Sequence, residues 1–151
     1  MKWSLAGPPI TGEAISEFER QFGKKLPDDI RLLLEQETNG GYQEGYFFLP
    51  MDGDGATEIT HLYGIGHPEP VFDMFTVLAN MDRDRTDELW PFGSDLSGGQ
   101  FVLILDGHRK GEIHNMPDDS FSMGMGYSGR VAKDMQEFIR LLNSPSLPPP
   151  F

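Results

Sequence analysis

The sequence contains no cysteine, and this absence excludes several kinds of chemistry. Disulfide bonds, thiolate metal sites and a cysteine nucleophile cannot form without it. A long apolar run is also missing, because no segment approaches the ~18 apolar residues that a membrane-spanning helix needs. Residues 1–12 carry one lysine, and Pro8 and Pro9 interrupt them before a secretory signal could form. We therefore expect a cytoplasmic protein that does not associate with membranes.

Positively charged residues are also scarce. The chain has 12 Lys and Arg against 24 Asp and Glu, a net charge of −12. Between Leu32 and Asp82 it has no lysine or arginine, and this stretch holds nine acids: Glu35, Glu37, Glu44, Asp52, Asp54, Glu58, Glu69, Asp73 and Asp82. No basic footprint for a phosphate backbone is present, so we expect no direct nucleic-acid binding. A basic protein would be attracted, although an acidic surface also serves solubility alone.

Apolar periodicity predicts four helices. Ile15, Phe18 and Phe22 share one face of a helix that begins after Thr11 and ends at Gly23. A second helix follows over 27–39, and the short connection between them predicts a helical hairpin. Further apolar stripes predict a helix over 71–79 and a final helix over 129–142, with Ser128 as its N-cap.

Four stretches predict β-strands, at 45–50, 57–66, 100–107 and 108–116. The run from Phe101 to Leu105 is continuously apolar, which is typical of a central strand buried on both faces. The stretch that follows it is expected to be its antiparallel neighbour. The fold class is therefore α+β: a mainly antiparallel sheet, with the N-terminal helical hairpin, a middle helix and a C-terminal helix packed on it. We expect one domain, 1–143, and a proline-rich tail, 144–151, that cannot be helical.

No catalytic or metal-binding pattern stands out. The sequence DGDG at Asp52–Gly55 is similar to the start of an EF-hand loop, but position 12 of such a loop would be Tyr63 rather than glutamate. The four histidines, at 61, 67, 108 and 114, lack the spacing of a helical metal clamp. The segment SDLSGG, which includes Asp95, has turn residues but no nucleophile elbow. We therefore expect no cofactor and no metal. A hydrolase that uses a carboxylate or histidine site stays open as an alternative to the two binding functions considered below.

The order of these segments resembles the SMI1/KNR4 family of the SUKH superfamily. The resemblance rests on Gly23, Leu26, Pro27 and Asp28 at the helical junction, on Asn39-Gly40-Gly41 after the second helix, on Phe92-Gly93-Ser94-Asp95 with Gly98 before the central strand, and on Phe138 with Leu141 or Leu142 in the last helix. It covers residues 14–142. Where that family has Trp-Asp after a late strand, this sequence has Asn115 and Met116.

The resemblance implies an α+β binding protein without catalytic residues. Bacterial members of the family resemble immunity proteins that bind and block a toxin domain, and an acidic surface would attract a basic, nuclease-type toxin. We therefore expect a protein partner, and a monomer or weak dimer. The alternative is an intracellular scaffold of the same fold. The partner-binding residues that we predict are Glu44, Tyr46, Asp52, Asp54, Glu58 and Asp95, and the candidate aromatic anchors are Tyr42, Tyr46, Phe47 and Tyr63.

Overall fold

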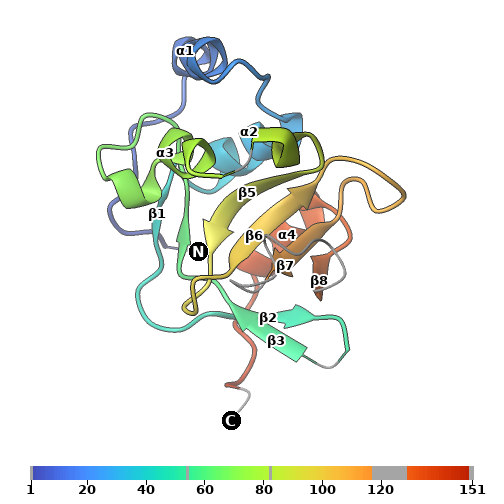
Figure 1. Ribbon diagram of the computed structural model, residues 1–151. Coiled ribbons are helices and arrows are strands. Elements are labelled where there is room, and N and C mark those ends of the chain that lie inside the picture. The colour runs from blue at the N-terminus through green and yellow to red at the C-terminus, as the bar shows by residue number, and fades with distance from the viewer. Residues whose placement is uncertain (1, 54, 82, 117–128, 150–151) are drawn as a thin grey trace.

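The computed structural model describes residues 2–53, 55–81, 83–116 and 129–149, and it has the predicted α+β class. Its main sheet has six antiparallel strands in the order β1-β4-β5-β6-β7-β8, and β2 and β3 form a separate antiparallel pair. The strands are β1 (Gly41–Tyr42), β2 (Phe48–Met51), β3 (Gly55–Glu58), β4 (His61–Leu62), β5 (Leu89–Ser94), β6 (Gln100–Ile104), β7 (Ile113–Met116) and β8 (Gly129–Ala132). Figure 1 shows the pair at one end of the molecule, below the main sheet.

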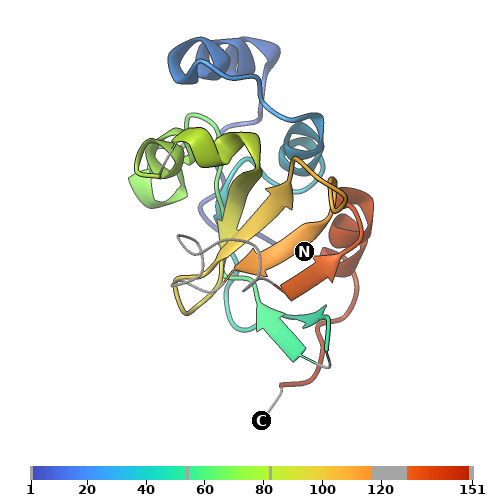
Figure 2. The ribbon, with the colours of Figure 1, turned by 45° about the vertical axis from the view of Figure 1, so that its right-hand side comes forward.

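The helices are α1 (Gly12–Phe22), α2 (Asp28–Gln36), α3 (Met74–Ala79) and α4 (Met135–Leu142), with short 3₁₀ turns at Pro70–Phe72 and Arg83–Asp87. The first helix begins and ends where its sequence predicts. Thr11 caps it by accepting a hydrogen bond from the Ala14 amide, and Gly23 ends it with a left-handed φ of 83°. Helices α1, α2 and α3 lie toward the upper end of the molecule in Figures 1 and 2, while α4 lies behind the sheet in Figure 1 and at its right in Figure 2.

The core lies between the sheet and the helices. Trp90 of β5 contacts Phe22 of α1, with ring centroids 5.7 Å apart, and Phe92 contacts Phe138 of α4 at 5.3 Å. A smaller apolar cluster on the opposite face of the sheet contains Leu89, Val102, Ile104 and Met116. The central strand β6 is therefore buried on both faces, as its apolar run predicts.

Several predicted elements are shorter in the structure, and two of them differ in kind or in pairing. The final helix begins at Met135 rather than near residue 129, because Asp134 caps it by accepting from the Glu137 amide. Residues 129–132 form β8 instead, and the predicted cap Ser128 lies outside the described residues. The predicted strand 57–66 is divided at Ile59 and Thr60: its first part belongs to β3 in the small sheet, and its second part is β4 in the main sheet.

The N-terminal segment, residues 3–8, is tied along the edge of the main sheet. Ser4 and Tyr42 exchange two backbone hydrogen bonds of 2.8 and 2.9 Å, so this segment extends the sheet beyond β1. Asn39 donates from its side chain to the Pro8 carbonyl at 2.8 Å. The Trp3 indole donates to Glu37 at 3.3 Å. The edge of the sheet at β1 is thereby closed by the chain itself.

Candidate functional site

The acidic hairpin, which we define as residues 46–59, is the element that brings most of the predicted partner-binding residues together. It contains β2, β3 and the turn at Asp52 and Gly53, where Gly53 has a φ of 80°. Figures 1 and 2 show it projecting at the end of the molecule opposite α1. Asp54 is part of the hairpin in sequence but lies outside the described residues. No lysine or arginine occurs anywhere in the hairpin.

Alternation along the hairpin gives it an inner and an outer face. Leu49 and Met51 point into the core cluster, and Thr57, which pairs with Leu49, is buried with them. Phe48 and Glu58 are cross-strand partners, so their side chains share the other face. The Tyr46 ring stacks on Phe48 at 6.2 Å with an interplanar angle of 11°, and Tyr46 remains 71% exposed. The outer face therefore combines a supported, exposed aromatic ring with a carboxylate.

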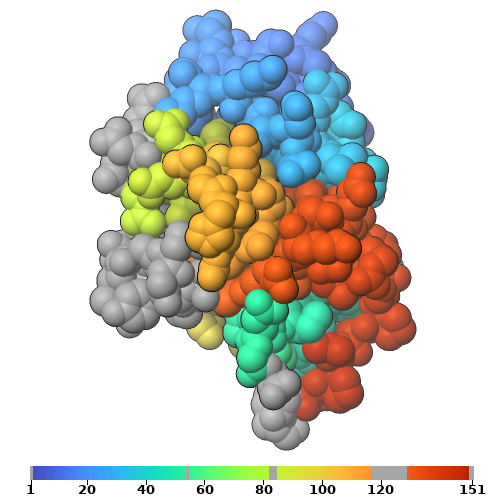
Figure 3. All heavy atoms as spheres, turned by 90° about the vertical axis from the view of Figure 1, so that its right-hand side faces the viewer, coloured from blue at the N-terminus to red at the C-terminus, as the bar shows by residue number. Residues whose placement is uncertain are grey.

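The hairpin is fastened to the rest of the fold along β2. The Asp52 amide donates to the Arg130 carbonyl of β8 at 2.9 Å. The Phe48 amide donates to the Ser146 hydroxyl at 2.8 Å, and the Leu147 amide donates to the Phe48 carbonyl at 3.2 Å. The space-filling view of Figure 3 shows the hairpin (teal) against the C-terminal segment (red). The first part of the proline-rich tail thus supports the hairpin, and no local pattern in the sequence reveals this long-range contact.

Asp52 forms an ion pair with Arg130, 3.2 Å between Oδ2 and Nε, with the two side chains 62% and 42% exposed. Arg130 also lies 3.6 Å from Glu112, whose carboxylate is 2.8 Å from the ring of His114. The hydrogen bond from His114 lowers the pKa of Glu112, whereas burial lowers the pKa of His114. With His114 neutral, this group of two carboxylates and one guanidinium keeps a net negative charge beside the hairpin.

Glu44 lies in the loop between β1 and the hairpin and is exposed. Its carboxylate accepts from the Ser4 hydroxyl at 3.1 Å and from the Tyr42 hydroxyl at 3.3 Å. Glu44 therefore helps to hold the N-terminal segment on β1 and still presents a charge to solvent, two residues before Tyr46.

Asp95 has a different position, in the turn between β5 and β6. Its carboxylate accepts from the Ser97 amide at 2.9 Å, the Gly99 amide at 2.7 Å and the Asn115 side chain at 3.1 Å. A Cβ at Gly99 would collide with this carboxylate, which explains the glycine. These bonds give Asp95 a role within the turn.

The four candidate aromatic anchors differ greatly in exposure. The prediction for Tyr63 is wrong, because this residue is only 3% exposed and its hydroxyl donates to Gln100 at 2.6 Å. Burial raises the pKa of Tyr63 to about 12. Tyr42 is half-buried and stacks on Phe72 at 6.2 Å, and Phe47 is also half-buried. Of these four, Tyr46 is the one whose ring stands free for contact.

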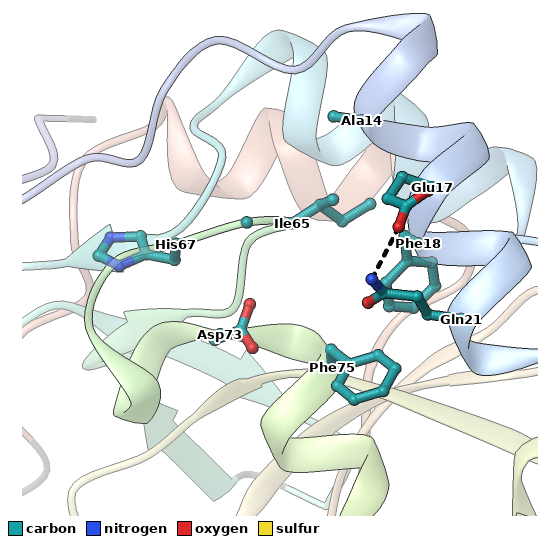
Figure 4. A pocket seen from close by; sticks show the side chains of 9 residues that line it. Ala14, Glu17, Phe18, Gln21, Ile65, His67, Asp73 and Phe75 are labelled. Carbon is teal, nitrogen blue, oxygen red and sulfur yellow. Dashed lines mark hydrogen bonds between the residues drawn. The ribbon is translucent and has the colours of Figure 1, made fainter.

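A pocket of about 400 Å³ lies between α1, residues 65–67 and the start of α3 (Figure 4). Its polar side chains already have partners within the fold. Glu17 accepts from Gln21 at 2.7 Å and pairs with Arg20, and Asp73 caps α3 by accepting from the amide and hydroxyl of Thr76. His67 is bonded to the Leu5 carbonyl and accepts from the Glu69 amide. The arrangement resembles helix capping and loop fastening rather than an acid–base pair.

A second, more open pocket of about 510 Å³ lies beside His61, Tyr63 and Gln100. Burial lowers the pKa of His61 to about 4, so this imidazole is neutral near pH 7. Within the described ranges, no group of three His, Asp or Glu side chains is arranged to hold a metal ion.

Comparison with known families identifies one match. The family model described as the SMI1 / KNR4 family (SUKH-1) matches residues 9–141, which is most of the chain. A comparison with curated proteins finds no match. In the part of the chain that the structure describes, no helix has the length and apolar character needed to cross a membrane. The match includes α1 and α2, the main sheet, the acidic hairpin and nearly all of α4, and the chain therefore belongs to the SMI1/KNR4 family.

Proposed function

We propose that the protein is a non-catalytic, cytoplasmic binding protein, an immunity protein that binds and neutralises a basic, nuclease-type toxin domain. Its family is associated with immunity proteins that act against toxins, which supports this class of function. The observation that carries the proposal is the acidic hairpin, which projects from the fold, presents Tyr46 at 71% exposure and lies in a stretch without lysine or arginine.

The proposed interface consists of Glu44, Tyr46, Asp52 and Glu58, together with Asp54 from the sequence. Its carboxylates would act mainly on the rate of encounter. Complementary charge raises the association rate constant from ~10⁵–10⁶ to as much as ~10⁸–10⁹ M⁻¹s⁻¹ at low salt. A rate of this order suits an inhibitor that must reach a toxin before the toxin reaches its substrate.

Tyr46 would contribute the binding free energy that keeps the partner bound after encounter. Its ring is already stacked on Phe48 in the free protein, so little conformational freedom is lost when a partner covers it. Exposed tyrosines that become desolvated are common among the residues that dominate binding energy, typically at 2 kcal/mol or more. Neutralisation would follow from occlusion, because the bound hairpin covers the basic surface with which such a toxin contacts its substrate.

The test begins with a pull-down from source cells, read by mass spectrometry, to obtain the partner. Its association rate is then measured at low and high salt against three proteins. These are the wild type, the double variant Asp52→Lys/Glu58→Lys, and the control Glu13→Lys/Asp106→Lys, which changes two exposed acids on other elements by the same net charge. We expect the hairpin variant to associate at least tenfold more slowly at low salt and the control to stay within twofold. The difference should shrink at high salt, where surface charges are screened.

A growth assay distinguishes immunity from scaffolding. The partner is expressed alone and together with the wild-type protein. Growth arrest by the partner, relieved by the wild type, is the expected result. A harmless partner would favour the scaffold alternative, and an unchanged association rate for the hairpin variant would remove the acidic hairpin from the interface.

A further inference from the structure

The outer edge of β3 makes no backbone hydrogen bond among the residues that the structure describes. The Ile59 amide donates to the Phe47 carbonyl at 3.1 Å, so the amides of residues 59, 57 and 55 face β2. Hydrogen-bonding direction alternates along a strand, and the N–H and C=O groups of Ala56 and Glu58 therefore face away from β2. They form a short, unpaired edge at the projecting end of the molecule (Figure 1).

The opposite edge of the hairpin shows the contrast. Along β2, the amides of Phe48 and Asp52 are bonded to Ser146 and Arg130, and Pro50 has no N–H to satisfy. Folded proteins commonly protect an open edge with lysine, proline or a covering segment. The sequence of β3, Gly-Ala-Thr-Glu, carries neither lysine nor proline, and Glu58 is its one charged residue. Within the described residues, the strand that no segment covers is thus the one that faces outwards.

We propose that the outer edge of β3 pairs with an extended, basic segment of the protein partner, which adds to the hairpin as a third strand. This inference rests on the proposed function and specifies how the acidic hairpin binds. Strand addition draws affinity from main-chain hydrogen bonds and specificity from alternate side chains. The edge offers the N–H and C=O groups of Ala56 and Glu58 for this purpose.

The side chains of β3 indicate which sequence would fit. On the outer face, a residue of the added strand opposite Glu58 would lie ~5 Å from it between Cβ atoms, where lysine or arginine is favoured. Two residues away, the same face of the added strand meets Ala56, whose small side chain leaves room for a large apolar residue. A segment that reads basic–x–apolar therefore matches the edge.

Charge also disfavours a second copy of this chain as the source of the strand that pairs with the outer edge of β3. Self-pairing would bring together two hairpins that each carry Glu58 and Asp52, with no lysine or arginine in either. Like charges in such proximity are destabilising. A basic segment replaces this repulsion with attraction.

The test uses two synthetic octapeptides with the same alternating lysine, leucine and threonine side chains. One has an ordinary backbone, and the other is N-methylated at two adjacent central residues, which blocks hydrogen bonding on both of its edges while keeping its charge. Binding to the full-length protein is measured by calorimetry. We expect the ordinary peptide to bind at least tenfold more tightly than the methylated one. Its binding should also slow hydrogen exchange at the Ala56 and Glu58 amides.

Two variants locate the effect. Ala56→Pro removes an outward N–H at a position where an edge strand tolerates proline, and it should abolish the preference for the ordinary peptide. Ala56→Ser keeps the N–H and should retain the preference. Thermal unfolding checks that both variants are folded, and the exchange measurement on the wild type does not depend on either of them.

Several results would overturn strand addition. They are equal binding of the two peptides, no binding of either, an unchanged preference in Ala56→Pro, or exchange protection elsewhere than on β3. Dimerisation of the wild type that Ala56→Pro abolishes would assign the edge to a second copy. Equal binding would leave the proposed function intact, since that function is tested separately by the association rate and by growth.

Discussion

The two ends of the molecule differ in where the cationic partners of their acids come from. At the end formed by α1 and α2, three acids pair with cations of that same end: Glu17 with Arg20, Glu35 with Arg31 and Asp87 with Lys24. At the acidic hairpin, the one cation that the described structure brings near is Arg130, which comes from β8. The hairpin thus contains no cation of its own, and Asp52 takes its partner from another element, whereas the helical end supplies its own cations.

The two ends also differ in how much apolar surface they bury. The helical end and the main sheet enclose a core of aromatic rings, whereas the hairpin adds Leu49 and Ile59 to that core and leaves Tyr46 outside. Stability should therefore depend on the core, and binding should depend on the hairpin. Three predictions test this division.

The largest expected effect is on stability. Phe138 is fully buried and contacts Phe92 and Phe101, so Phe138→Ala should lower the free energy of unfolding by about 3–5 kcal/mol. Tyr46→Ala should change it by less than ~1 kcal/mol while weakening partner binding. Urea unfolding of both variants measures the difference. Comparable losses of stability would show that the hairpin aromatic belongs to the core and would break the comparison.

The intermediate effect is on pH dependence. The pKa of His61 is about 4 in the folded protein, below the ordinary value of 6.5, so the unfolded state takes up a proton first as pH falls. The contribution of the neutral His61 side chain to the free energy of unfolding is complete above pH 6.5. It is lost between about pH 6.5 and 4 and amounts to a figure on the order of 2 kcal/mol. Burial lowers the pKa of His114 as well, which adds to the same trend. Replacing His61 with glutamine should flatten the stability profile over this range; identical slopes for variant and wild type would contradict the prediction.

The smallest effect concerns the ion pair of the hairpin. Both side chains of Asp52 and Arg130 are substantially exposed, and such pairs contribute about 0–1 kcal/mol. Asp52→Asn should therefore leave the unfolding midpoint nearly unchanged, yet it should slow association with a basic partner at low salt. A loss of stability above ~1 kcal/mol would instead make this residue structural and would blur the division.

The sequence predicted the elements whose signals are local. Thr11 and Gly23 mark both ends of α1, the apolar run 101–105 marks β6, and Asp52-Gly53 marks the hairpin turn. The start of α4 was misplaced because Val131 fits both a helical stripe and a buried strand position. The discriminating signal is Asp134, three residues before Glu137.

Other features could not be predicted because they depend on distant contacts. Strand β5 contains Pro91 and Gly93, which interrupt a strand pattern, but a bulge between them accommodates the proline opposite Val102. The contact of Ser146 and Leu147 with Phe48 joins segments about a hundred positions apart. The candidate site follows the same rule: its acids were visible in the sequence, but the open edge of β3 and the burial of Tyr63 were not.

The two tryptophans stand in separate parts of the fold, and this makes the protein its own fluorescent reporter. Trp90 is 1% exposed and its indole donates to the sulfur of Met74 at 3.4 Å, so its emission follows the docking of the helices on the sheet. Trp3 is half-buried and fastened to Glu37, so its emission follows the release of the N-terminal segment from β1. Single Trp→Phe replacements would let the two events be watched independently, without any added dye.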